Sequence, residues 1–567
     1  MAPRAGVGGE RTGMTVMGRI LGLERFWRRR DARAVPTALA RPGPPPGLGE
    51  AARGRALVEA ARGGRSILML APGPNTEAMH RFGWLDDLAA LGGPAARDLA
   101  WRWIDEWIGR HEGPGEGWSP DILSARIARW VGHAAWLTQT PPRPERRALF
   151  LRSLSRQTRW LARHWSGAAP SERPQVLAAL IAAETALDGA PAQPARRAAA
   201  MGRAAAEAVG PDGGIGARAP EALLELFCAL IESAELLGQH VTPPHRDAIA
   251  RIAPVLRGLR HVDGGLARFH GGGRGAPGRV ERALAQAPRG AAAPLPMGFA
   301  RLASGRSSVI IDAAAPPEGP GATMAHASTL AFEMTVGRRP LIVNCGSGLR
   351  HGPDWRRAGR ATPSHSTLCV EGRSSARLDQ APDGRETLRD GPREVLTHRF
   401  DAERLQRMEA SHDAWRKAFG LTHDRRLALD RGGAVLVGED LLTTLGPPDE
   451  RAFEAASRAG RHPGVGFAIR FHLHPDVVAE SDPHGTTARL TLRSGEVWEL
   501  SHDGGARLSL APSVYLENSH PDPVPTQQVV LSGRAMAYAT LVRWSLVRMG
   551  DGVPAPRDLW RGEDAPA

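Results

Sequence analysis

Hydrophobic residues recur every three or four positions between residues 80 and 260, a spacing that places them on one face of a helix. The pattern predicts a series of helices over Asp98–Ile108, Ser124–Leu137, Arg147–Trp165, Glu172–Leu187, Arg196–Val209, Pro220–Leu237 and Pro244–Leu259. Stretches rich in Gly and Pro, such as Gly210–Gly214, separate these segments, and helices are expected to end there. The N-terminal half is therefore predicted to consist of helical hairpins.

Beyond residue 300 the hydrophobic period falls to two, which is typical of half-buried β-strands. The predicted strands span Ser307–Asp312, Leu330–Val336, Pro340–Asn344, Ser366–Val370, Glu394–Phe400, Leu405–Ser411, Thr422–Leu429, Ala434–Asp440, Ala468–Leu473, Ala488–Leu492, Val497–Ser501, Arg507–Leu510, Gln527–Leu531 and Ala539–Arg548. Helices followed by strands, without alternation, predict an α+β multidomain chain in which a C-terminal antiparallel β-sandwich follows the helical half.

Changes in composition predict the domain boundaries. Residues 1–50 are rich in Arg, Gly and Pro, and we expect a disordered or irregular leader there. A helical domain is predicted for residues 51–275, a linker for 276–300, a β-sandwich domain for 301–555 and a tail for 556–567.

The balance of charges leaves two interpretations open. The net charge of +13 and the pI near 11.0 favour a polyanionic partner. However, Lys417 is the only lysine among 73 Lys and Arg residues, so genomic base composition explains an arginine surplus spread over the surface equally well. The sequence contains no aromatic–basic pattern of an RNA-binding module, and we therefore expect no nucleic-acid partner.

Sequence features bearing on the compartment are few. No run approaches the roughly 20 apolar residues of a membrane span, so we expect none. The apolar stretch Met14–Leu23 holds Arg19 and two glycines, which is not the form of a signal peptide, and a cytoplasmic location stays open. Cys345 and Cys369 can pair in an oxidising compartment; the alternative is that they and Cys228 are buried thiols.

Several segments, in a fixed order, resemble the heparinase II/III-like family. Ala325–Met334 and Leu341–Gly346 resemble the family's H-x-H-A-D-x-L-S-F-x-L and V-D-x-G strands, and Ser364–Gly372 resembles its A-H-N-T-V-x-V-D-G segment. Ser411–Trp415 resembles its S-H-D-G-Y segment, and His423–Leu427 and Gly438–Asp440 resemble its H-x-R-R-L and G-x-D pieces. Arg470–Val477 resembles its R-F-H-L-H-P-D-V segment, and Pro211–Pro220 and Asp263–Leu266 resemble its two Gly-rich turns. Each match alone is weak, but the ordered set over residues 80–550 is specific.

The resemblance implies a fold and an activity. The fold is an N-terminal (α/α) toroid of helical hairpins joined to C-terminal antiparallel β-sheets, and family members work in the cell envelope or periplasm. Its enzymes are carbon–oxygen lyases that cleave uronate-containing acidic polysaccharides by β-elimination. That reaction needs a donor or cation that neutralises the uronate carboxylate, a base for the C5 proton and an acid for the leaving oxygen.

The resemblance also implies site residues. The second His of the H-x-H motif matches His326, the Asp of V-D-x-G falls on Asn344, and the His of A-H-N-T matches His365. In some members these positions bind a structural zinc, so the three residues are candidate zinc ligands. His326, His365 and Arg218, the last from a Gly-rich turn, are the candidate catalytic residues.

Three residues are candidates for binding substrate: Arg218, His270 and Asp263. A guanidinium at Arg218 can neutralise a carboxylate, and His270 precedes the flexible run Gly271–Gly273. The structural alternatives are an arginine at a helix end, a loop histidine without a role, and an Asp-Gly turn that needs a positive φ. We interpret Arg425–Arg426 as a solvated pair on a strand.

The sequence also departs from the family at the positions that carry the chemistry. Met324 stands where the family has the first His of H-x-H, which resembles a catalytic base, and methionine cannot transfer protons. Ser328 and Ile215 replace a further Asp and His, and the two tyrosines, Tyr515 and Tyr538, both lie outside the helical half. A second hypothesis is therefore a non-catalytic protein of the cell envelope that binds glycan.

Overall fold

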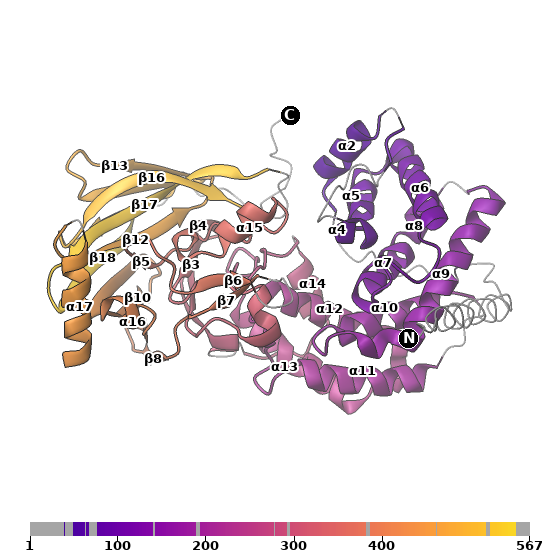
Figure 1. The fold of residues 1–567 in the computed structure, drawn as a ribbon, viewed down its shortest axis with the longest axis horizontal. Coiled ribbons are helices and arrows are strands. Elements are labelled where there is room, and N and C mark those ends of the chain that lie inside the picture. Colours follow the sequence, from indigo (N-terminus) through magenta and orange to yellow (C-terminus); the bar gives the residue numbers. More distant parts are fainter. Residues whose placement is uncertain are drawn as a thin grey trace, which may run out of the picture. The chain divides into compact units, whose positions relative to one another are not determined.

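The computed structural model describes residues 39, 49–62, 64–66, 76–139, 142–188, 193–276, 278–291, 295–380, 386–460, 462–517 and 522–550. These residues form two compact units (Figure 1). The first unit extends to residue 201 and includes 233–241, and the second contains 202–232 and the chain from residue 242 onward. The predicted leader, apart from residues 39, 49 and 50, and the predicted tail lie outside the described residues.

The first unit is helical. Its helices are α2 (Ala51–Ala60), α4 (Thr76–His80), α5 (Gly83–Leu91), α6 (Gly93–Arg110), α7 (Pro120–Gly132), α8 (Ala134–Leu137), α9 (Pro144–His164) and α10 (Arg173–Ala186), and α11 (Pro194–Ala208) and α12 (Pro220–Leu237) have residues in both units. Helix α2 packs against α5, and α7 contacts both α9 and α10. Pro at the first or second position begins α6, α7, α9 and α10, where its missing N–H leaves no hydrogen bond unmade.

Tryptophan side chains form much of the core of this unit. Trp103, Trp107 and Trp130 are almost completely buried. The ring of Trp107 meets Phe82 and Trp130 edge to face, with ring centroids 5.6 and 6.1 Å apart. Such edge-to-face pairs add to the free energy of burying large aromatic surfaces. No helix in the described part of the chain has the length and apolarity needed to cross a bilayer.

The second unit contains the strands and the remaining helices. The strands are β1 (Phe299–Ser304), β2 (Ser307–Asp312), β3 (Phe332–Val336), β4 (Arg339–Val343), β5 (Leu368–Val370), β6 (Arg377–Gln380), β7 (Glu386–Arg389), β8 (Val395–Asp401), β9 (Leu405–His412), β10 (Thr422–Asp430), β11 (Val435–Thr443), β12 (Val465–Leu473), β13 (Val477–Ser481), β14 (Thr487–Leu492), β15 (Val497–His502), β16 (Arg507–Tyr515), β17 (Val524–Ala535) and β18 (Ala539–Gly550). The helices are α13 (Pro243–Gly258), α14 (Arg279–Ala285), α15 (Pro353–Gly359), α16 (Arg416–Phe419) and α17 (Pro447–Ala459).

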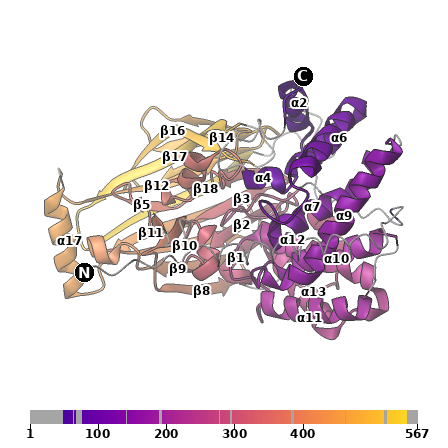
Figure 2. The same cartoon turned by 45° about the vertical axis from the view of Figure 1, so that its right-hand side comes forward.

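All the strands except β6 and β7, which pair with each other, form two large antiparallel sheets that pack face to face (Figure 2). One sheet has the order β1-β2-β3-β4-β12-β17-β16 with β5 beside β12, and the other has the order β13-β14-β15-β18-β11-β10-β9-β8. Apolar side chains from both sheets share one core, in which Phe332 of β3 stacks on Trp544 of β18. The predicted fold class, α-helical hairpins followed by an antiparallel β-sandwich, is confirmed.

Some elements differ from the prediction. The sequence pattern did not indicate β1, β6, β7 and β13, and α14 lies inside the predicted linker 276–300. The predicted domain boundaries stay a prediction. The two compact units are divided at other positions, since residues 202–232 of the helical half belong to the unit that contains the strands. Arg425 is not solvated as predicted: it is buried and binds both carboxylate oxygens of Asp440, at 2.8 and 3.1 Å.

Candidate functional site

Arg218 and Asp312 form a buried ion pair in the second unit. Asp312 is the last residue of β2, and Arg218 lies in the turn before α12 with φ +51°. Arg218 Nη2 donates to Asp312 Oδ1 at 2.5 Å, while its Nε and Nη1 donate to the carbonyls of Met297 and Ala315 at 2.8 and 2.6 Å. The guanidinium is therefore saturated by acceptors of its own chain, and the left-handed backbone of a non-glycine residue shows that this position is held under strain.

His270 extends the ion pair toward the histidines. Its side chain is fully buried, and its Nδ1 accepts the backbone N–H of His326 at 3.1 Å. In the neutral ring the proton is therefore on Nε2, which lies 3.3 Å from Asp312 Oδ2. Ser328 donates to the same oxygen at 2.7 Å. His270 is thus a structural donor inside the fold rather than a mobile loop residue.

His326 and His365 are hydrogen-bonded to each other. The carbonyl of Ala361 accepts from His365 Nδ1 at 2.8 Å, so His365 Nε2 carries a lone pair in the neutral ring. His326 Nδ1 lies 3.1 Å from that atom and donates to it. Both rings are almost completely buried, and the relay fixes both tautomers.

Burial controls the protonation of this network. Desolvation, reinforced by the neighbouring histidines, lowers the pKa of His326 well below its ordinary value. Burial likewise lowers the pKa of His365, to about 4. For Asp312, burial alone would raise the pKa, but the charge of Arg218 and the contact with His270 hold it well below the usual range. At neutral pH the network therefore consists of an ionised Arg–Asp pair and neutral histidines.

The three candidate zinc ligands do not form a suitable donor set. Asn344 Oδ1 accepts the backbone N–H of Ser366 at 2.9 Å, and its Nδ2 has no hydrogen-bond partner among the described residues. One ligand is therefore a neutral amide that is already engaged, whereas structural zinc sites use charged thiolates and histidines in a complete tetrahedral set. His365 Nε2 is engaged as well, as the acceptor of His326. These residues do not fit a structural zinc.

Asp263 lies outside the histidine network. Its Oδ1 accepts the backbone N–H of Gly265 at 3.0 Å, and its Oδ2 pairs with Arg274. These contacts fix the Asp-Gly turn, in which Gly264 has φ +94°. The structure thus brings Arg218, His270, His326 and His365 together around Asp312, a residue that the sequence analysis did not single out. The sequence signal for Asp312 was weak, because this residue only marks the end of a hydrophobic strand.

Both tyrosines of the chain lie in this unit, and neither presents a free phenol as a base or acid for β-elimination. Tyr515 is buried, and burial raises its pKa although Arg268 lies over its ring. Tyr538 is half-exposed and donates to Glu454 at 2.6 Å. Met324 lies half-buried beside the guanidinium of Arg356, whose Nη2 is 3.8 Å from its sulfur.

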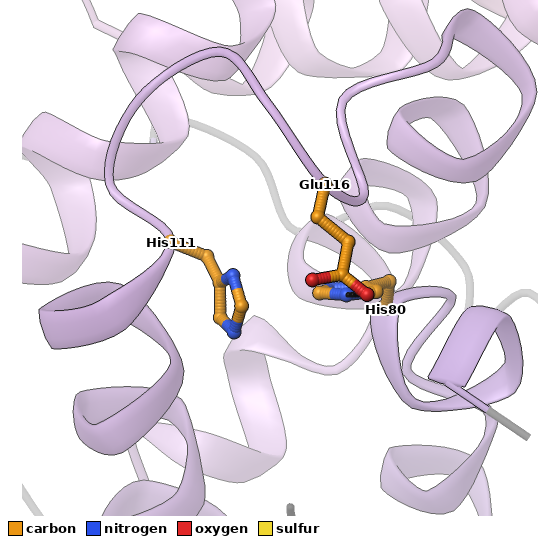
Figure 3. A group of neighbouring side chains, drawn as sticks. All are labelled: His80, His111 and Glu116. Carbon is orange, nitrogen blue, oxygen red and sulfur yellow. Dashed lines mark ion pairs between the residues drawn. The ribbon is translucent and has the colours of Figure 1, made fainter. Parts of the chain in front are cut away.

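A second group with ligand-type side chains lies in the helical unit. Figure 3 shows the imidazole of His111 and the carboxylate of Glu116 facing His80, with potential ligand atoms within 4.8 Å of one another. Trp107 Nε1 donates to His80 Nδ1 at 3.0 Å, which places the proton of the neutral ring on Nε2, the atom that faces Glu116. A metal-binding histidine has the opposite arrangement, because it donates its outer N–H and ligates with the other nitrogen.

The electrostatics of this group also oppose a cation. Burial lowers the pKa of His80, and the charges of His111 and Arg126 lower it further. The buried guanidinium of Arg126 donates to the His80 carbonyl at 2.9 Å and lies over the Trp107 ring, 4.1 Å from its centroid. His80 is therefore held as a structural residue of the aromatic core.

Comparisons with known proteins agree with this fold. Residues 286–545 match the family model "Heparinase II/III-like, C-terminal". FtsZ-localized protein C of Caulobacter vibrioides is 31% identical over 487 residues, which cover 83% of this chain and 81% of that protein. Solved structures at much lower identity show its fold.

Two solved structures illustrate the likeness. Heparinase III superposes with a TM-score of 0.61 at 11% identity, covering 83% of this chain and 77% of its own. A mutant of the heparan sulfate lyase HepC from Pedobacter heparinus superposes with a TM-score of 0.55 at 13% identity, covering 97% of this chain and 92% of its own. The match of residues 286–545 to the family model and the relative at 31% identity, whose alignment covers 83% of this chain, establish that the chain belongs to the heparinase II/III-like family.

Proposed function

We propose that this protein is a non-catalytic member of the family that acts as a binding protein in cell division. The observation that supports the non-catalytic part is the buried network around Asp312. Arg218 is saturated by one carboxylate and four carbonyls, and His326 and His365 are bonded to each other. No group of this network is left to bind a uronate carboxylate.

The chemical requirements of β-elimination sharpen this conclusion. A base must reach the C5 proton with a pKa matched to neutral pH, and an acid must protonate the leaving oxygen. Met324 occupies the position of one family histidine, and burial lowers the pKa of His365 to about 4, which makes it a weak base at neutral pH. The phenol nearest in sequence to the family strands, Tyr515, is buried with a raised pKa.

The sequence comparisons support the proposed role in cell division. The chain is 31% identical to FtsZ-localized protein C but only 11–13% identical to the two lyase structures described above. A relative at the higher identity over most of both chains is the better guide to cellular role. We therefore propose that this chain acts at the site of cell division, with FtsZ assemblies.

A fluorescent fusion of the full chain tests this assignment. In the organism that encodes it, the fusion should coincide with labelled FtsZ and should disperse when FtsZ is depleted. A fusion that stays away from FtsZ, while remaining full-length and soluble, would contradict the assignment to division.

A second candidate function is the binding of an acidic polysaccharide. The net charge of +13 favours a polyanion, and the structural neighbours include a heparan sulfate lyase. Calorimetric titration of the purified protein with uronate polymers should then show binding that weakens as salt screens the charges. The absence of binding to every polymer tested would eliminate this candidate.

The same samples distinguish binding from cleavage. We expect no rise in absorbance at the unsaturated-uronate band with the natural protein, and a rise would overturn the non-catalytic proposal. Met324→His restores an imidazole at the family position, and Met536→His places one at an exposed methionine as a matched control. If Met324→His alone gains turnover, the loss of this side chain is a cause of the lost activity.

A further inference from the structure

A surface hollow in the second unit is lined almost entirely by basic side chains. Its walls are Arg257 in the last turn of α13, Arg260 and His261 in the turn that follows, Val262, and Arg301 on β1. Figure 2 labels both α13 and β1. The hollow is separate from the buried network around Asp312, with which it shares no residue.

Each of the three arginines has a buried guanidinium nitrogen without a hydrogen-bond partner among the described residues. These nitrogens are Arg257 Nη1, Arg260 Nε and Arg301 Nε. Buried donors in folded proteins are almost always paired, so three unpaired guanidinium donors on residues that line one hollow favour a ligand that supplies acceptors. His261 contributes to the lining but not to this set, because its Nε2 faces Glu333.

The remaining donors of these residues have ordinary structural roles. Arg257 Nη2 donates to the Pro288 carbonyl at 2.6 Å, and Arg301 Nη1 donates to the Arg257 carbonyl at 3.2 Å. His261 Nδ1 is held by Ser308 Oγ at 2.8 Å, and its opposite nitrogen faces the carboxylate of Glu333 on β3. Arg301 Nη1 therefore caps the C-terminus of α13, whereas Arg301 Nε has no hydrogen-bond partner among the described residues that would explain its position.

The charges of the hollow do not balance. Arg260 pairs with Glu281, but no carboxylate among the described residues lies within 4 Å of Arg257 or Arg301. Glu333 Oε2 lies 3.7 Å from His261 Nε2, and its charge is shared with Arg268. Burial and the nearby charge of Arg260 both lower the pKa of Arg301, which is the effect of like charges left uncompensated.

We propose that this hollow binds a tetrahedral oxyanion, either a free phosphate or sulfate ion or the same group carried as a monoester. Planar guanidinium groups donate paired hydrogen bonds to phosphate oxygens, and these charge-assisted bonds are among the strongest in proteins. The hollow has a volume of about 280 Å³, which is the space of roughly nine water molecules at ~30 Å³ each and accommodates a five-atom anion.

The two sources of the anion are separated by the choice of probe. Calorimetry and thermal unfolding of the full chain are measured with inorganic phosphate, inorganic sulfate and glucose 6-phosphate, and with glucose and sodium chloride at matched ionic strength as controls. Saturable binding of the free ions alone indicates a free-anion site. Tighter binding of glucose 6-phosphate indicates a site for a monoester.

Substitutions assign the binding to the hollow. Arg301→Gln and Arg257→Gln should each weaken binding by about tenfold or more, because each removes a charge-assisted contact. Arg489→Gln removes the same charge from an exposed position on β14 and should leave binding unchanged. Arg301→Lys keeps the charge but not the planar donors, and it should restore binding only in part.

The outcomes decide the proposal directly. It is overturned if neither phosphate, sulfate nor glucose 6-phosphate binds the folded protein in a saturable manner. It is equally overturned if Arg301→Gln and Arg257→Gln, with natural unfolding midpoints in anion-free buffer, bind as tightly as Arg489→Gln. Neither result bears on the proposed role in division, which rests on other residues and on another experiment.

Discussion

The Nδ1 atom of His326 lies 3.1 Å from the Nε2 atom of His365, and the second ring is held in turn by the carbonyl of Ala361. In this relay His365 Nε2 is the acceptor, so a proton added to it would face the Nδ1–H of His326. Protonation of His365 therefore removes the present hydrogen bond unless His326 moves its own proton to Nε2. The stability of the protein is consequently linked to pH through a pair of residues that the family resemblance identifies as catalytic.

The first prediction concerns acid. The pKa of His365 falls from 6.5 in the unfolded chain to about 4 in the fold, so the unfolded state binds more protons between these values. The stabilisation is complete above pH 6.5 and is lost as the pH falls toward 4. The stability difference between the natural protein and His365→Gln, measured by urea unfolding, should shrink by about 2 kcal/mol from pH 7 to pH 5. An exposed control, His398→Gln, should show a constant difference.

A second prediction concerns the ion pair. Replacing Arg218 by Met leaves the buried carboxylate of Asp312 without its countercharge and should destabilise the protein by about 3–5 kcal/mol. Asp312→Asn should be less harmful, because Arg218 keeps its carbonyl acceptors. The double variant should lose less than the sum of the two single losses, as contacting residues do. Additive losses in urea midpoints would show that the pair is not coupled.

Zinc provides the third prediction. The natural donor set at His326, Asn344 and His365 lacks a carboxylate, so added Zn²⁺ should not raise the unfolding midpoint of metal-free protein. Asn344→Asp supplies the missing charge and should gain zinc binding, visible as a Zn²⁺-dependent rise in the midpoint and by calorimetry. Asn344→Ser, which supplies no charged ligand, is the matched control. Stabilisation of the natural protein by Zn²⁺ would reverse our conclusion about these residues.

A contact between neighbouring strands of one sheet gives a fourth prediction. Gly438 of β11 lies opposite Trp544 of β18, and a Cβ atom added at Gly438 would overlap the indole ring. Gly438→Ala should therefore destabilise the protein by about 1–3 kcal/mol through displacement of a core side chain. Gly550→Ala, at the end of β18 where a Cβ meets no neighbour within 4 Å, should be close to neutral. Equal thermal midpoints for the two variants would contradict this account.

Periodicity alone predicted most of the long elements. The helices α6 to α13 and the strands β8 to β12 coincide with predicted segments to within a few residues, because each has one apolar face turned to a core. The short strands β6 and β7 have no buried face, and their burial is at most partial, so no alternation marked them. Helix α14 was hidden by the Gly- and Pro-rich sequence around it.

The candidate site was predicted only in part. The motifs located His326 and His365 because these positions hold the same residue type as the family motifs. The protonation and hydrogen bonding of a side chain, however, depend on contact partners that the sequence does not reveal. Asp312 was missed since a single acid at the end of a strand is common in surface turns. Arg425 was interpreted as solvated for a related reason: its partner Asp440 is adjacent only through the register of β10 and β11.

The ion pair between Arg218 and Asp312 has an evolutionary consequence. Its arginine is encoded in the helical half of the gene, yet it belongs to the same compact unit as the strands. A recombination event that transferred only the segment for the β-sheets would deliver Asp312 without its countercharge. Genes that inherit this β-sheet module intact are therefore expected to carry it from about residue 202 onward, with α12 attached.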